Sequence, residues 1–232
     1  MNHIKRGIKD GLPIGIGYFS VSFSFGVLAG NYGFFWWQAV LISMTNLTSA
    51  GQFAGIGLMA AGGAYIEMMI TQFTINMRYA FMSLSLSQKV DKKFGGIYRW
   101  LLGFGMTDEI FAVAARNKVV SKSYFAGLLV LPYIGWTSGT LAGAVLGNIL
   151  PNLLAGALSV SLYAMFIAIV VPEMKNFRSV TVVVSIAIAL RVAFYYLPVL
   201  RDISSGFALT ICAIAAAFIG AICFPIGGED GE

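Results

Sequence analysis

The chain has 232 residues, of which 58% are hydrophobic and 11% are charged, and its formal net charge is +5. Soluble domains carry about 25% charged residues, so this chain lacks the side chains needed to cover a water-facing surface. The composition excludes an ordinary soluble domain and leaves no room for a separate soluble catalytic domain. The basic residues fall in short clusters between apolar runs, so they give no reason to propose a nucleic-acid partner.

The first ten residues form a polar segment, 1–10, that carries Lys5, Arg6 and Lys9. A long apolar run, 11–30, follows it. Together, the polar segment and the apolar run resemble a signal peptide, but the apolar run is too long and shows no clear cleavage site. We therefore predict a cytoplasmic N-terminal segment followed by a retained first membrane span.

Apolar segments of helix length recur along the rest of the chain. Prolines lie near most of the segment ends, as expected for helix boundaries, whereas Pro132 lies inside a segment and should kink that helix. We predict one transmembrane domain over 11–225 and a short acidic tail, 226–232, that is disordered. The eight predicted segments are 11–30, 34–61, 64–87, 100–115, 123–149, 152–171, 179–197 and 205–224.

Small residues mark two of these segments as packing faces. In lipid, a stripe of small residues allows another helix to approach closely, because packing must replace the hydrophobic drive that water would supply. The same two segments share a short echo, Gly17-Tyr18 and Gly135-Trp136, which indicates a possible internal repeat. The small residues of the stripes are Gly135, Gly139, Gly143 and Gly147 in one segment and Ser22, Gly26 and Gly30 in the other.

The basic clusters decide the predicted topology. If all eight segments crossed the membrane from a cytoplasmic N-terminus, the cluster at 89–99 would lie outside, against the positive-inside rule. The conflict disappears if segments 34–61 and 100–115 each enter and leave on the same side. The other clusters lie at 5–9, 116–122 and 175–178.

The length of segment 100–115 supports this solution. Its roughly 16 residues give about 24 Å of helix, which is shorter than a ~30 Å hydrocarbon core. We therefore predict an all-α polytopic membrane bundle with about six full spans, two broken or re-entrant helices, and both termini in the cytoplasm.

Segment 64–87 carries polar residues on two faces, so it must lie inside the bundle rather than face lipid. Glu67 and Arg78 share one face, and Asn76 lies on roughly the opposite face. Ionisable residues at membrane depth are costly and usually mark a transport path or site. The alternatives are that Arg78 is a structural cation near the cytoplasmic end and that Glu67 lies at the membrane interface.

The stretch 43–52 interrupts segment 34–61 with polar and glycine residues, among them Asn46 and Gln52. Such a stretch can unwind and expose backbone N–H and carbonyl groups at membrane depth. Discontinuous helices of this kind hold small zwitterions in transporters. The alternative is a polar helix packed against segment 64–87.

Two further sets of ionisable residues lie in apolar sequence. Asp108 and Glu109 are adjacent carboxylates, an arrangement that suits proton coupling. Alternatively they pair with Arg78 or Arg191 and hold the fold together. Arg191 lies well inside segment 179–197 and needs an anionic partner, which can be a protein carboxylate or a substrate.

No catalytic triad, metal-ligand cluster or phosphate-binding glycine loop is recognisable, so we expect neither enzyme activity nor a cofactor or metal. Cys212 and Cys223 share the last apolar segment, where their spacing fits neither a disulfide framework nor a metal site. We expect both to be small buried hydrophobic residues.

With these residues identified, the chain resembles the AzlC family, the large subunit of two-component branched-chain amino acid exporters. The resemblance covers nearly the whole chain. The family pattern usually continues Asn-x-Arg with His, whereas Tyr79 follows here, so no role for that imidazole carries over. The matching motifs are Gly11-Leu12-Pro13, Phe25-Gly26, Ser49-Ala50-Gly51-Gln52-Phe53, Asn76-Met77-Arg78 and Thr107-Asp108-Glu109.

The resemblance implies export of leucine, isoleucine and valine, with methionine as a further candidate. It also implies a small AzlD-type membrane subunit as partner and a bacterial or archaeal plasma membrane as location. The competing interpretations are a non-transporting scaffold or sensor and a channel for another solute. Ionisable groups that are few and scattered, rather than ringed along a pore, favour a carrier.

An aliphatic amino acid needs a carboxylate site, an ammonium site and an apolar pocket. Our hypothesis gives each polar residue one of these roles. Asn46 and Gln52 act with the unwound backbone, Arg78 or Arg191 supports the carboxylate, Asn76 and Glu67 orient the amine, and Asp108 or Glu109 takes the coupling proton.

Overall fold

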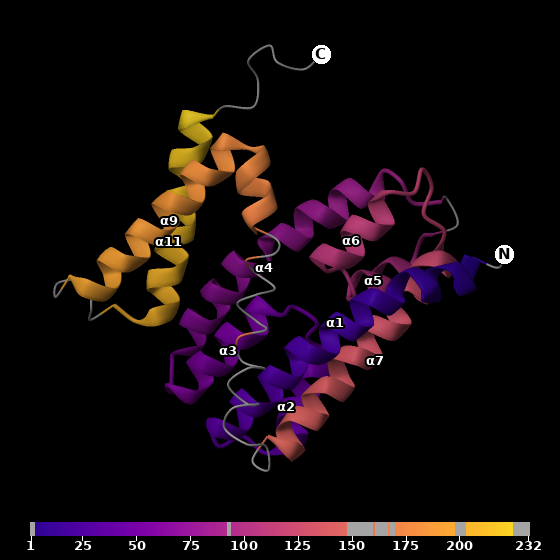
Figure 1. The fold of residues 1–232 in the computed structure, drawn as a ribbon, viewed down its shortest axis with the longest axis horizontal. Coiled ribbons are helices and arrows are strands. Elements are labelled where there is room, and N and C mark those ends of the chain that lie inside the picture. The colour runs from indigo at the N-terminus through magenta and orange to yellow at the C-terminus, as the bar shows by residue number, and fades with distance from the viewer. Residues whose placement is uncertain are drawn as a thin grey trace. The chain divides into compact units, whose positions relative to one another are not determined.

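The computed structural model describes residues 3–91, 94–147, 160, 167, 170–197 and 203–224. This part of the chain is helical, with one isolated bridge between Val90 and Val120 and no longer strand. The all-α prediction is therefore confirmed. The helices (Figure 1) are α1 (His3–Asn31), α2 (Trp36–Thr45), α3 (Ala50–Ala60), α4 (Tyr65–Ser87), α5 (Ile97–Gly103), α6 (Asp108–Ala115), α7 (Lys122–Leu146), α9 (Arg178–Tyr196) and α11 (Ser205–Cys223).

Within the described residues, four helices are long and apolar enough to cross a membrane: α1, α7, α9 and α11. Helix α4 has 23 residues, about 34 Å at 1.5 Å per residue, but its polar residues set it apart from these four. The predicted segment 152–171 lies largely outside the described residues, as does the acidic tail. The predicted number of full spans therefore stays a prediction.

The chain divides into two compact units. The first unit comprises Met1–Ile56 and Asn76–Leu162, and the second comprises Gly57–Ile75 and Tyr163–Glu232. Helices α3 and α4 contribute to both. Each unit is described by itself.

The first unit is built on the pair of α1 and α7, which lie side by side along their lengths (Figure 1). A Cβ atom on Gly143 would collide with the Phe23 carbonyl, and one on Gly26 would lie 2.6 Å from the Ala144 nitrogen. The predicted packing stripes are therefore confirmed at these positions. Gly30 is the exception, because a Cβ there would meet nothing within 4 Å.

Helix α1 begins at His3, so Pro13 lies inside the helix rather than near its start. The packing against α7 explains this difference. A Cβ on Gly7 would collide with the Tyr124 carbonyl, and one on Gly11 would lie 2.5 Å from the Leu128 carbonyl. Tertiary contact thus holds the polar first turns of the chain in helical form.

The segment predicted at 34–61 is broken, as expected. Helix α2 ends at Thr45, residues 46–49 are not helical, and Ser49 has a φ of 42°. The chain then turns back, because Gln52 Nε2 donates to Ser43 Oγ at 2.5 Å. Ala39 of α2 and Ile56 of α3 share one buried cluster. Together α2 and the start of α3 form a hairpin, which we call the first hairpin.

The segment predicted at 100–115 is also a hairpin, formed by α5, the non-helical residues 104–107, and α6. Its two ends lie together. The Lys89 ammonium, which precedes α5, donates to the Ala115 carbonyl at 2.7 Å, and the Val120 N–H donates to the Lys89 carbonyl at 2.8 Å. This segment, which we call the second hairpin, is therefore broken, as expected, and its two ends lie together, whereas its entry into and exit from the membrane on one side stay a prediction.

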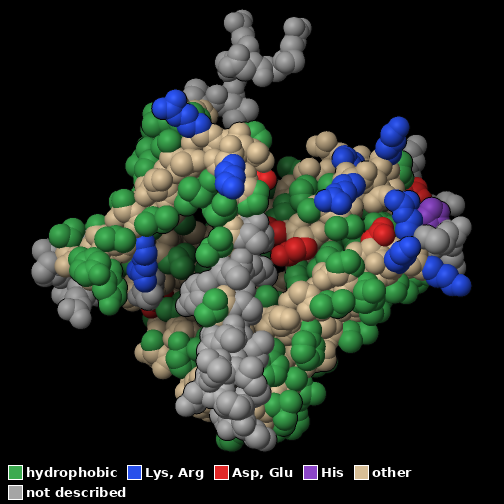
Figure 2. Space-filling model, viewed as in Figure 1, with side chains coloured by type: hydrophobic (Ala, Val, Ile, Leu, Met, Phe, Trp, Pro, Cys, Tyr) green, Lys and Arg blue, Asp and Glu red, His purple; other side chains and the backbone are tan. Residues whose placement is uncertain are grey.

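The predicted basic clusters of the first unit gather at this end. Arg6 Nη2 donates to Asn117 Oδ1 at 2.9 Å, so the start of α1 joins the loop after α6. Figure 2 shows several Lys and Arg side chains at this end, near the N-terminus. We call it the basic end, and its location in the cytoplasm stays a prediction of the positive-inside rule.

The second unit pairs α9 with α11, which lie side by side (Figure 1). A Cβ on Gly220 would collide with the Val183 side chain, so the two helices are in close contact. Both cysteines are free thiols. Cys212 is buried as expected, whereas Cys223 is exposed at the end of α11, where the burial prediction was wrong.

Candidate functional site

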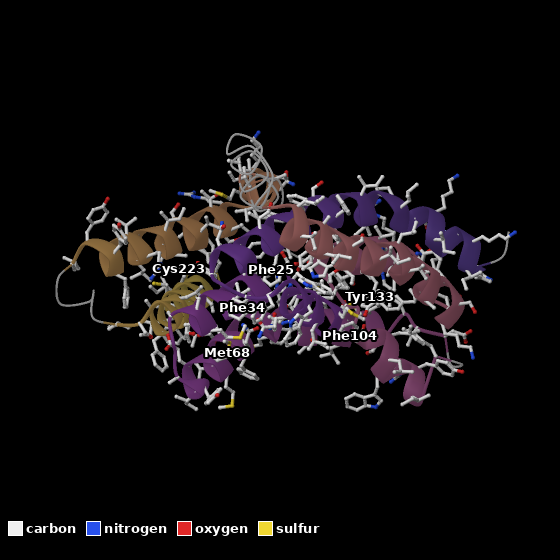
Figure 3. All side chains as sticks on the ribbon, turned by 90° about the horizontal axis from the view of Figure 1, so that it is seen from below. Phe25, Phe34, Met68, Phe104, Tyr133 and Cys223 are labelled. Carbon is white, nitrogen blue, oxygen red and sulfur yellow. The ribbon has the colours of Figure 1, made fainter. Side chains whose placement is uncertain are left out.

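The breaks of the two hairpins meet beside Tyr133 of α7. The Tyr133 hydroxyl donates to the Met44 carbonyl at 3.1 Å, and its ring packs edge-on against Phe104 with centroids 6.3 Å apart (Figure 3). Leu47 of the first break and Gly105 of the second line one cavity of about 230 Å³. We call this place the junction, formed by residues 46–49 and 104–107 together with the adjoining part of α4.

Helix α4 contributes an ion pair that links the junction's two sides. Arg78 Nη1 lies 2.7 Å from Asp108 Oδ2, at the start of α6. Arg78 Nη2 donates to the Tyr79 hydroxyl at 3.2 Å, and that hydroxyl donates to the Thr48 carbonyl in the first break at 3.3 Å. The two consecutive residues Arg78 and Tyr79 thus contact both hairpins.

The Arg78–Asp108 ion pair is partly exposed. The side chains of Arg78 and Asp108 are 39% and 31% exposed. Two buried polar atoms of the junction, Arg78 Nε and Ser49 Oγ, have no hydrogen-bond partner among the described residues. The junction therefore combines an accessible ion pair with buried polar atoms that another molecule can satisfy.

Helix ends add backbone groups to the junction. Helix α3 begins directly after the first break, and α6 begins directly after the second, with Thr107 as its N-cap. Helix N-termini carry unpaired N–H groups and a partial positive charge. The Asp108 and Glu109 carboxylates in the first turn of α6 match that charge.

A buried tyrosine connects the second break to α1 and α7. The Tyr18 hydroxyl lies 2.6 Å from both Thr107 Oγ1 and Glu109 Oε2. Its ring packs edge-on against Trp136, with centroids 5.3 Å apart. Tyr18 is 5% exposed and Trp136 is 1% exposed, so both belong to the interior of the first unit.

A second buried set fixes the first hairpin to α7. Trp136 Nε1 donates to Gln52 Oε1 at 3.0 Å, and Gln52 Nε2 donates to Ser43 Oγ at 2.5 Å. The Ser43 hydroxyl in turn lies 2.7 Å from the hydroxyl of Thr140. Both ends of the Gln52 amide are therefore satisfied inside the protein, which indicates that Gln52 positions the first hairpin.

Comparison with known proteins identifies the family. A family model described as AzlC protein matches residues 13–150, a range that contains both hairpins and Arg78. A membrane protein of Archaeoglobus fulgidus is 31% identical over 98% of this chain and 95% of its own length. The chain belongs to the AzlC family.

Other relatives are similar over a shorter part of the chain. The inner membrane protein YgaZ of Escherichia coli is 30% identical over 60% of this chain and 58% of its own length. A Helicobacter pylori membrane protein is 25% identical over 62% of this chain. No solved structure matches. AzlC proteins are membrane proteins of a family linked to transport, and this chain is one of them.

The AzlC junction brings together only some of the polar residues singled out in the sequence. Arg78 and Asp108 pair there, and Asn46 lies in the first break, where its Oδ1 accepts a hydrogen bond from the Thr48 hydroxyl. Asn76 lies one half-turn before Arg78 on α4 and is half-buried. Their proposed substrate contacts stay predictions.

Glu67 and Arg191 belong to the second unit of this AzlC chain. Glu67 is only 4% exposed, so within that unit it is a buried carboxylate. Its Oε1 accepts hydrogen bonds from the Ser204 hydroxyl and from the Gly206 N–H at 3.2 Å, at the start of α11. Arg191 is exposed on α9. Their predicted roles are not tested by this arrangement.

Sequence reasoning missed the aromatic residues that support the site. Tyr18 and Trp136 were visible only as parts of the echo between Gly17-Tyr18 and Gly135-Trp136. Aromatic residues are frequent in membrane helices, so their type gives no signal. The echo was the available sign, because it marked the positions at which α1 and α7 place these two rings in contact.

Proposed function

We propose that this AzlC-family chain is the transport subunit of a branched-chain amino acid exporter and that the junction is its substrate site. The observation that carries the proposal is the accessible Arg78–Asp108 ion pair at the junction of the two broken hairpins. Broken helices at membrane depth supply the backbone groups that hold zwitterions in transporters.

The ion pair has the right charges for an amino acid to insert between its members. The substrate carboxylate binds the Arg78 guanidinium, and the substrate ammonium binds the Asp108 carboxylate, so each partner exchanges one opposite charge for another. The Thr48 carbonyl, which accepts from the Tyr79 hydroxyl at the junction, is proposed as a further acceptor for the ammonium. Arg78 is proposed for the carboxylate in preference to Arg191 because it lies at the junction.

The apolar part of the substrate needs a pocket of matching chemistry. The junction cavity of about 230 Å³ is lined mainly by apolar side chains, including Leu47, Phe104 and Leu129. A side chain of three or four carbons fits such a space, whereas a charged side chain would lose its hydration there without a partner. This favours leucine, isoleucine and valine as substrates.

The same geometry supports a proposal of proton coupling. A proton and the substrate ammonium compete for the Asp108 carboxylate, so protonation of Asp108 releases the substrate. Competition of this kind exchanges one proton for one amino acid and suits export against a gradient. Glu109 is the alternative proton site, since it is adjacent to Asp108 and lies 2.6 Å from the Tyr18 hydroxyl.

The proposed partner is a small AzlD-type membrane subunit in the plasma membrane. The test is efflux of radiolabelled leucine from cells that express this chain with and without that subunit. Saturable, proton-dependent efflux that requires both chains supports the proposal. Flux without saturation or coupling would indicate a channel, and no flux from a verified, membrane-inserted pair would indicate a scaffold or sensor.

A matched pair of variants tests the site itself. Arg78→Ala and Asp108→Asn should insert into the membrane normally and abolish most of the efflux. Arg116→Gln is the control, because Arg116 is exposed at the basic end and outside the junction. Full efflux from the two junction variants would remove the junction as the substrate site.

A further inference from the structure

A second cavity lies in the first unit, near the basic end. Its volume is about 160 Å³, and it lies between the last turns of α4 and the residues around α5. Its floor is apolar, formed by the buried side chains of Leu86, Phe94 and Phe125. We call it the peripheral pocket.

The peripheral pocket is separate from the junction cavity. The two cavities share no lining residue, and they flank the second hairpin. Met106 of the second break lines the peripheral pocket, whereas its neighbours Phe104 and Gly105 line the junction cavity. One stretch of backbone thus contributes to the walls of both.

Arg99 supplies a positive charge at one side of the pocket. Its Nε donates to the Phe94 carbonyl at 3.0 Å, which fixes the plane of the guanidinium. Its two terminal nitrogens make no hydrogen bond or ion pair with any residue that the structure describes. A guanidinium held in this way can bind a carboxylate through both terminal nitrogens.

The part of the pocket that α4 lines favours a positive charge. Ser83 and Ser87 line it from the last two turns of α4, and α4 ends at Ser87. The C-terminal end of a helix carries partial negative charge on its carbonyls and attracts cations. The pocket therefore has a site for an anion, a site for a cation, and an apolar floor.

These three features match a small aliphatic zwitterion. A cavity of this volume is comparable with the engineered apolar cavity of about 150 Å³ that binds benzene, so a side chain of three or four carbons fits. A lipid acyl chain is several times longer. The carboxylate can meet Arg99 while the ammonium meets the end of α4.

We propose that the peripheral pocket is a second binding site for the aliphatic amino acid, at which the substrate is loaded from the cytoplasm before it reaches the junction. The choice of amino acid rests on the proposed function, whereas the pocket and its charges do not. The side of entry follows from the position at the basic end, which the positive-inside rule predicts to lie in the cytoplasm.

Cysteine protection tests this proposal in membrane vesicles. Cys212 and Cys223 are replaced by serine, and Ser83→Cys then places one thiol in the pocket. Leucine at about ten times its Kd should slow alkylation of this thiol about tenfold, because only unoccupied pockets react. Ser85→Cys is the matched control on the same helix, and its alkylation should be unaffected, because Ser85 is exposed and does not line the pocket.

Substitutions combined with Ser83→Cys identify the groups that bind leucine in the peripheral pocket. Protection at position 83 should disappear with Arg99→Gln, persist with Arg116→Gln, and persist with Arg78→Ala, which removes the junction's cation. Glutamate and lysine should not protect. Loss of protection in the Arg78→Ala background would mean that leucine acts through the junction, and this would overturn the proposal.

Two other outcomes would also overturn it. Alkylation could proceed at an unchanged rate at about 10 mM leucine, ten times a millimolar Kd. The thiol could instead be unreactive in vesicles without leucine and reactive in detergent, which would mean that lipid fills the pocket. Efflux without protection would refute the loading site alone, and protection without efflux would refute the transport function alone.

Discussion

In the proposed transport cycle, Asp108 binds either the substrate ammonium or the coupling proton. Its carboxylate faces Arg78 on one side and is adjacent to Glu109, and Tyr79 lies beside the same guanidinium. An amide at position 108 can still accept a hydrogen bond from an ammonium, but it cannot take up a proton. The coupling and the binding can therefore be separated by substitution.

Asp108→Asn should reduce net efflux of leucine by at least tenfold and make the remaining exchange of leucine for leucine independent of pH. Glu109→Gln should retain the pH dependence, although it loses the contact with Tyr18. Both are measured as leucine exchange in vesicles between acidic and neutral pH. The reverse result would place the coupling proton on Glu109.

A substitution at Gln52 tests whether this side chain binds substrate or positions the first hairpin. Gln52→Leu leaves the buried Trp136 Nε1 without its acceptor, at a cost of about 1–3 kcal/mol for an unsatisfied buried polar group, whereas the Ser43 hydroxyl keeps its contact with Thr140. We expect a lower unfolding temperature in detergent. Gln88→Leu, at an exposed position after α4, is the control. An unchanged unfolding temperature for both would assign Gln52 to substrate instead.

The residues of the site could be predicted from sequence only where polarity was unexpected. Arg78 and Asp108 were identified because ionised groups stand out in apolar segments. The sequence did not decide that Arg78 pairs with Asp108, because Arg191 is an equivalent cation and Glu109 an equivalent carboxylate. Tyr18 could not be identified, because its role depends on which helix packs against α1.

At the scale of the helices, glycine has different consequences at different places in α1. A Cβ on Gly26 would collide with the Thr140 carbonyl of α7, whereas one on Gly30 would meet nothing within 4 Å. The two positions lie one turn apart on one helix, so they provide a matched pair.

Gly26→Ala should lower the unfolding temperature and the yield of folded protein, because the α1–α7 backbones must separate. Overpacking of this kind costs about 1–3 kcal/mol. Gly30→Ala should be neutral or stabilising by about 0.5–1 kcal/mol, the helix penalty of glycine. Thermal unfolding in detergent measures both. Equal effects would contradict the close packing at Gly26.

The broken helices were the elements that sequence predicted best. The polar stretch 43–52 indicated the first break, and the conflict of the cluster at 89–99 with the positive-inside rule indicated the second hairpin. The start of α1 was not predictable, since residues 3–10 are polar and become helical through contact with Tyr124 and Leu128 of α7. Such long-range packing leaves no local signal.

For the whole molecule, the hairpin arrangement makes a definite prediction about sidedness. In a background without cysteine, Lys118→Cys and Lys89→Cys should both react with a membrane-impermeant reagent from the cytoplasmic side. Tyr32→Cys, at the far end of α1, should react only from the outside. Comparing inside-out with right-side-out vesicles measures this. Opposite sides for positions 89 and 118 would contradict the re-entrant second hairpin.

The Arg78–Asp108 pair also has a consequence for the response to membrane voltage. The empty and substrate-loaded sites carry the same charge, because an inserted zwitterion adds none, whereas protonation of Asp108 adds one positive charge. Each unit charge that crosses 100 mV gains about 2.3 kcal/mol. An inside-negative potential therefore distinguishes the proton-bearing form from the other two, which respond to voltage alike.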